Sequence, residues 1–110
     1  MPREKTVEIE MNGEKVEVKM RSLTAIEEED TFDEAGMGMN VVDGKAHMVG
    51  NFNKYIRFQV AKSIQSPESL KGKPDVVGAL DGAEYTKLRV GYLEIKGMKK
   101  DEKDFLSTSS

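Results

Sequence analysis

Hydrophobic and polar residues alternate along the first segment of the chain. Between residues 6 and 20 every second position is apolar on either side of Asn12-Gly13. Asn-Gly is typical of a two-residue hairpin turn, because both residues tolerate a positive φ. The pattern therefore predicts a β-hairpin with Ile9 opposite Val16, one apolar face and one charged face. The apolar face consists of Val7, Ile9, Val16, Val18 and Met20.

Apolar residues later recur every three or four positions, which is the spacing of amphipathic helices. A first helix is predicted from Thr24, where Thr24 and Glu27 form a capping-box pattern, to a stop at Gly36. A second is predicted over residues 51–65, capped by Asn51 or Asn53. Its apolar stripe consists of Phe52, Tyr55, Ile56, Val60 and Ile64. An isolated hairpin is marginally stable in water, so we expect the hairpin to pack on this second helix.

The segment after residue 65 carries three helix-start signals in succession. Ser66-Pro67 predicts a short turn and Pro74-Asp75 a short helical piece. Asp81 is the predicted N-cap of a longer helix, with Glu84 in the reciprocal position of a capping box. Its apolar residues are Tyr85, Leu88, Val90, Tyr92, Leu93 and Ile95, and it ends at Gly97. Gly91, in its middle, is unfavourable for a helix by roughly 1 kcal/mol relative to alanine and indicates close packing against a neighbour.

Residues 36–51 have a different composition, with four glycines and three methionines. One interpretation is a long mobile connection. The other is a second hairpin around Asp43-Gly44, which would pair Val42 with Lys45. Two interpretations also remain for Met37, Met39 and Met48. Flexible thioethers suit an adaptable partner-binding surface, but the same side chains could cover the edge of the core.

Strands that precede helices, rather than alternate with them, indicate an α+β fold: a small antiparallel sheet packed on three or more helices. A chain of 110 residues corresponds to one domain. We expect that domain to span residues 1–98, with a hairpin (6–20), a helical part (24–97) and a mobile loop (36–51). A polar tail would occupy residues 99–110.

Composition excludes several classes of protein. The chain has no cysteine, which removes disulfides, thiolate metal sites and cysteine nucleophiles. Its net charge of −3 argues against binding to a nucleic-acid backbone. No apolar run is long enough to cross a bilayer, and the first ten residues lack the apolar core of a signal peptide. We therefore expect a soluble protein of the cytoplasm without a membrane partner.

Few residues suggest chemistry. Six acidic side chains on the first predicted helix could form a cation site, a docking face for a basic partner or a solvated surface; they are Glu27, Glu28, Glu29, Asp30, Asp33 and Glu34. Their spacing is not that of a calcium loop. His47, the single histidine, has no nucleophile and orienting partner recognisable in the sequence. The sequence predicts no catalytic residue, no metal site and no cofactor.

Three phrases of the sequence resemble the tail assembly chaperones of long-tailed bacteriophages. Leu23, Thr24 and Glu27 match the phrase L-T-x-x-E of that group, and Ser66-Pro67 stands at its junction after the central helix. The third phrase, L-D-x-x-E-Y-x-x-L, comprises Leu80, Asp81, Glu84, Tyr85 and Leu88. The resemblance covers most of the chain, but residues 36–51 are not part of it.

The resemblance implies a non-enzymatic protein that binds the tape-measure protein and keeps it soluble until tail tube subunits polymerise around it. It also implies self-association, and a location in the cytoplasm of the infected bacterial or archaeal host. Met37, Met39 and Met48 are the candidate partner-binding residues, by the argument from flexible thioethers above. Two alternatives are a structural tail or head-tail connector subunit of the virion, and an enzyme or metal-dependent factor that uses the acidic helix.

Overall fold

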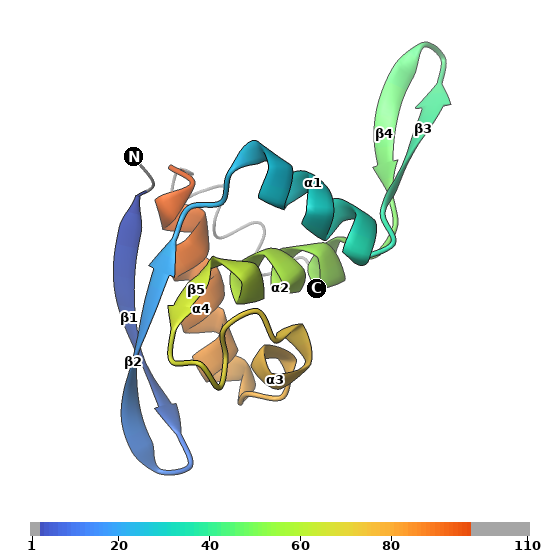
Figure 1. Cartoon of the computed structure of the whole chain (residues 1–110). Helices are drawn as coiled ribbons and strands as arrows, with labels where there is room; N and C mark the ends of the chain where they lie inside the picture. Colours follow the sequence, from blue (N-terminus) through green and yellow to red (C-terminus); the bar gives the residue numbers. More distant parts are fainter. Residues whose placement is uncertain (1–2, 98–110) are drawn as a thin grey trace.

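The computed structural model describes residues 3–97 and has an α+β architecture, as the sequence predicts (Figure 1). A three-stranded antiparallel sheet lies against a group of helices, and a separate two-stranded hairpin projects from that body. The elements in chain order are β1 (Glu4–Met11), β2 (Glu14–Arg21), α1 (Ala25–Glu34), β3 (Gly38–Val42), β4 (Lys45–Val49), α2 (Phe52–Ser63), β5 (Ile64–Ser66), α3 (Pro74–Gly78) and α4 (Gly82–Ile95).

The N-terminal hairpin has the predicted turn and register. Asn12 and Gly13 both have positive φ, at 53° and 81°, and Ile9 lies opposite Val16. The third strand, β5, pairs with β2 and was not predicted. Ile64 belongs to the apolar stripe predicted for the second helix and Ser66 to the turn predicted after it, so the sequence carries no strand signal here. Ser66 precedes a proline, which disfavours the helical backbone and favours an extended one.

The sheet packs differently from our expectation. Apart from its partner strand β2, the element that contacts β1 most is the helix α4, rather than α2, the helix expected from the sequence. A methyl group built on Gly91 would lie 2.6 Å from Cγ2 of Val7, so α4 and β1 approach closely there. Lys5 and Glu94 also form an ion pair between the two elements. The small residue in the middle of α4 is what allows this approach, as its position in the sequence indicated.

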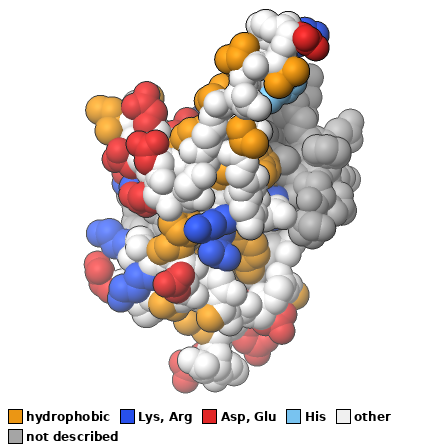
Figure 2. Space-filling model, turned by 90° about the vertical axis from the view of Figure 1, so that its right-hand side faces the viewer, with side chains coloured by type: hydrophobic (Ala, Val, Ile, Leu, Met, Phe, Trp, Pro, Cys, Tyr) orange, Lys and Arg blue, Asp and Glu red, His pale blue; other side chains and the backbone are white. Residues whose placement is uncertain are grey.

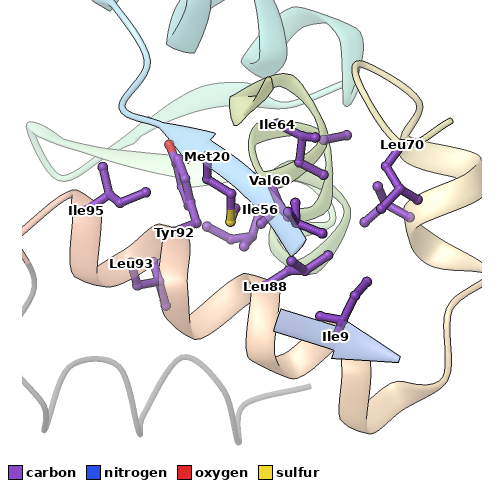
Figure 3. Close-up of a cluster of buried hydrophobic side chains, with 13 residues drawn as sticks. Ile9, Met20, Ile56, Val60, Ile64, Leu70, Leu88, Tyr92, Leu93 and Ile95 are labelled. Atoms are coloured by element: carbon purple, nitrogen blue, oxygen red, sulfur yellow. The ribbon is translucent and has the colours of Figure 1, made fainter. Parts of the chain in front are cut away.

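Three layers share one hydrophobic core: the sheet, α4 and α2 (Figure 3). The predicted apolar positions of the hairpin and both helices supply most of it. Its buried members are Ile9, Val18, Met20, Ile56, Val60, Ala61, Ile64, Leu70, Val77, Leu88, Tyr92, Leu93 and Ile95. The core thus joins strands and helices that are far apart in sequence in one contiguous cluster.

Thr24, Asn51 and Asp81 cap their helices as the sequence predicts, but only one of the two predicted capping boxes forms. Thr24 and Glu27 form the predicted capping box, and Asn51 caps α2 by accepting a hydrogen bond from the backbone N–H of Lys54 at 3.0 Å. Asp81 caps α4 through the backbone N–H of Ala83 at 2.9 Å. The predicted reciprocal bond of Glu84 is absent from the cap, because its carboxylate turns toward β1.

The buried carboxylate of Glu84 accepts hydrogen bonds from two groups outside that cap. The backbone N–H of Glu10 in β1 donates to Oε1 at 3.1 Å, and Lys87 donates to the same oxygen at 2.9 Å. In a capping box the glutamate accepts a hydrogen bond from the backbone N–H of its own helix's N-cap residue. Glu84 instead accepts one from a backbone N–H of the edge strand β1. The capping-box assignment for Glu84 was therefore wrong, and the residue instead ties α4 to the sheet.

Residues 38–49 form a second hairpin, which is named the arm below. Val42 pairs with Lys45 and Val41 with Ala46, which is the pairing expected for a second hairpin around Asp43-Gly44. Asp43 and Gly44 have φ values of 51° and 75°, which are those of a type I′ turn. The segment is thus regular β-structure and not an irregular connection. Its expected mobility remains a prediction.

The expected tail at residues 99–110 lies outside the described residues. Within residues 3–97, none of the helices has the length and apolar character needed to cross a membrane.

Candidate partner-binding site

The arm has one wholly apolar face. Residues that lie opposite each other in a hairpin project from the same side of it. The pairs Met39–Met48 and Val41–Ala46 therefore share one face, which is named the apolar arm face. The other face is mixed and carries Gly38, Asn40, Val42, Lys45, His47 and Val49.

The apolar arm face is open to solvent. Met39 is 60% exposed, Val41 68% and Met48 50%. Figure 2 shows the arm standing clear of the body with its hydrophobic side chains at the surface. Scattered exposed hydrophobic residues are ordinary, but a contiguous group on a projecting element is typical of an interaction surface.

The structure separates the three methionines that the sequence grouped together. Met39 and Met48 lie opposite each other on the apolar arm face, so the interpretation that they cover the core edge was wrong for these two. Met37 lies at the root of the arm and is half-buried. A methyl group on Gly50 would lie 2.6 Å from the Sδ of Met37 and 3.2 Å from its Cα, and the φ of 134° at Gly50 also favours glycine. Met37 therefore closes the root of the arm.

Val41 and Ala46 belong to the same face and were not among the predicted site residues. The signal that identifies them was present in the sequence. Once Asp43-Gly44 is accepted as a two-residue turn, the register brings Val41 opposite Ala46, on the side of Met39 and Met48. His47 lies on the opposite, mixed face, where it pairs with Asn40 and is exposed.

The acidic residues of α1 are spread over several partners. Glu27 pairs with Arg21 of β2 at 2.6 Å, Glu34 with Lys62 of α2 at 3.1 Å, and Glu28 with Lys96 at 3.3 Å. Within residues 3–97, no three histidine, aspartate or glutamate side chains are grouped so as to hold a metal ion. Glu27, Glu28 and Glu34 thus attach α1 to its neighbours, which is a structural role.

A basic recess of about 250 Å³ lies where α2, α3 and α4 meet, beside the root of the arm. Its lining residues are Asn51, Asn53, Lys54, Arg57, Gly78, Tyr85 and Arg89. The stem of Arg57 crosses Gly78, where a methyl group would lie 2.9 Å from its Cδ. Only Gly50 separates Asn51 from the arm in sequence, so the recess lies near the root of the arm. Figure 2 shows basic side chains gathered below the arm, with hydrophobic ones beside them.

The recess favours an anionic group. Three of its lining residues are cations and none is an acid. Arg89 donates from Nη2 to Oδ1 of Asn53 at 3.1 Å, which orients the guanidinium at the recess wall. Burial raises the pKa of Tyr85, while Arg89 and Arg57 act in the opposite direction. The phenol is therefore a neutral hydrogen-bonding group, and the guanidinium groups are well suited to a carboxylate.

Comparison of the chain with protein-family models, with curated proteins and with solved structures found no match.

Proposed function

We propose that this protein is a non-enzymatic tail assembly chaperone, which binds the tape-measure protein in the host cytoplasm and keeps it soluble during phage tail assembly. The partner in this proposal comes from the resemblance carried by Leu23, Thr24 and Glu27, by Ser66-Pro67, and by the phrase from Leu80 to Leu88. The binding surface in the proposal is the apolar arm face, with Met39 and Met48 as its largest side chains.

The observation that supports a chaperone role is the exposed apolar face on an element that projects from a charged body. A protein that shields an amphipathic helix needs apolar area that is accessible before the partner arrives. Methionine suits such a surface, because its unbranched thioether adapts to different neighbouring side chains. Ordinary core formation does not account for these side chains, since they contact solvent.

The basic recess supports a more specific partner chemistry. The recess lies near the root of the arm, so an amphipathic helix bound to the arm could place an acidic side chain beside Lys54 and Arg57. The preferred segment would thus have an apolar stripe and at least one glutamate or aspartate on its flank. The charge pairing would favour one orientation of the helix over the other.

Co-expression with a candidate tape-measure protein tests the proposal directly. We expect the two proteins to co-purify, and the partner to become insoluble when expressed alone. If the partner is soluble by itself and no complex forms, the chaperone proposal is wrong. A stable ring or tube of this protein without any partner would instead favour a structural tail or connector subunit.

Two matched double variants test the surface. Met39→Thr with Met48→Thr alters the apolar arm face, and Val42→Thr with Val49→Thr alters similarly exposed positions of the opposite face. Threonine keeps the preference for strands in both cases. Each buried methionine contributes about 1.5–3 kcal/mol, so isothermal titration with a tape-measure fragment should show a loss of tenfold or more for the first variant. Equal losses in both variants would contradict this surface.

A further inference from the structure

The outer edge of β3 differs from the other sheet edges in the described part of the chain. Strand edges are normally protected from pairing with other chains by charge, proline, bulges or shortness. The outer edge of β4 carries Lys45, β5 has three residues, and β1 carries Glu4, Lys5, Glu8 and Glu10. The residues of β3, Gly38 to Val42, include no charge and no proline.

The register shows which backbone groups this edge presents. The residues that flank a two-residue turn, here Val42 and Lys45, form a hydrogen-bonded pair. Hydrogen-bonded and non-hydrogen-bonded pairs then alternate away from the turn. Met39 and Val41 thus belong to non-hydrogen-bonded pairs within the arm, so their N–H and C=O groups point outward from β3. These outward-pointing N–H and C=O groups can form backbone hydrogen bonds with a further antiparallel strand.

We propose that two copies of this protein pair through β3, antiparallel, about a two-fold axis at Asn40. In this register Met39 of each copy lies opposite Val41 of the other, and each such pair exchanges two backbone hydrogen bonds. Asn40 lies opposite Asn40 of the second copy in a non-hydrogen-bonded pair. The two arms then form one four-stranded sheet, and their apolar faces join into one surface.

The uncharged residues of β3 and the marginal stability of a two-stranded hairpin favour pairing between two copies of the chain. A two-stranded hairpin is marginally stable by itself, and three or more strands with an apolar face are needed for stability. The arm residues from Met39 to Val49 are exposed, so the body of the same chain does not cover them. The two-fold register brings apolar residues together twice and places no like charges opposite each other. A second copy therefore completes the arm without any further partner.

Disulfide cross-linking tests the register, because the chain has no cysteine of its own. In the Asn40→Cys variant the two Cα atoms would be about 4.5 Å apart, within the range that a disulfide bridges. We expect rapid formation of a covalent dimer under mild oxidation. His47→Cys is the matched control, since it lies opposite Asn40 on the same face of the arm but on β4. Equal cross-linking rates for the two variants would overturn the proposal.

Sedimentation tests the same contact without a covalent bond. Wild-type protein should be a dimer at high concentration, and Asn40→Lys should weaken dimerisation roughly tenfold or more, because two lysines would lie directly opposite each other. His47→Lys adds the same charge to β4 and should leave the dimer intact. A monomer at every concentration, or an assembly that Asn40→Lys leaves unchanged, would overturn the proposal. Neither experiment requires the tape-measure protein, so failure here is separate from failure of the chaperone role.

Discussion

A methyl group on Gly91 of α4 would lie 2.6 Å from Cγ2 of Val7 in β1. This distance is shorter than a carbon–carbon contact allows, and the neighbour is a stiff β-branched side chain. The helix and the strand approach this closely because residue 91 has no side chain.

Gly91→Ala should therefore destabilise the protein, although alanine is the better helix former. Overpacking costs about 1–3 kcal/mol, which exceeds the gain in helix propensity of about 1 kcal/mol. Urea denaturation should show a lower midpoint. Combining Gly91→Ala with Val7→Ala should cost less than the sum of the two single variants, since the clashing methyl group is removed. Gly82→Ala, with no atom within 4 Å of the added methyl group, is the control and should not destabilise. Full additivity would contradict the contact.

Glu27 gives stability a defined dependence on pH. Both terminal nitrogens of Arg21 donate to its carboxylate, at 2.7 and 2.6 Å, and lower the pKa of Glu27 to about 2. The ordinary pKa of glutamate is about 4.3. A lowered folded-state pKa stabilises the protein above about pH 4.3, and this contribution is lost as the pH falls toward 2. The side chains of both residues are roughly a quarter exposed, so solvent screening limits the effect to about 1 kcal/mol.

Glu27→Gln removes this charge and keeps a residue that fits a capping box. We expect the free energy of unfolding to fall by about 1 kcal/mol at neutral pH, and the difference to vanish near pH 2. Glu29→Gln, on the same helix but away from Arg21, should change stability by less than about 0.5 kcal/mol. A penalty for Glu27→Gln that is constant between pH 2 and 7 would show that packing, rather than charge, is responsible.

The core makes the strongest prediction about folding. Leu88→Asp and Ile56→Asp each place an unpaired charge at a buried position, and either variant should unfold or aggregate. Ile26→Asp introduces the same charge at a position that is 70% exposed, in the first turn of α1, and should remain folded. Circular dichroism and thermal melting distinguish these outcomes. A wild-type melting temperature for Leu88→Asp would mean that the assigned helix face is wrong.

Amide exchange tests the mobility expected for the arm. We expect its amides to exchange faster than those of the β1–β2 hairpin, because no core residue covers them. The measurement is best made on Asn40→Lys, so that pairing between copies does not add protection. Protection equal to that of Val18 in the β2 strand would show that the arm is rigid by itself.

Local sequence determined the first hairpin and most helix boundaries. Asn12-Gly13 defines the register of β1 and β2, because a two-residue turn allows only one pairing of the apolar positions. Thr24, Asn51 and Asp81 each bond to amides two or three residues away. Such contacts depend on residues close in the chain, which is why they can be recognised from the sequence.

Tertiary structure alone decided which elements pack together and which surfaces remain open. Glu84 fits a capping box by spacing, but an amide of β1 lies within its reach and receives its carboxylate instead. The sheet rests on α4 because Gly91 allows the closest approach, and Ile64 to Ser66 form a strand because β2 offers an edge. The sequence suggested a hairpin and a role for Met39 and Met48, but their exposure depends on the arm projecting from the core. Burial and long-range pairing involve residues tens of positions apart, and no local pattern specifies them.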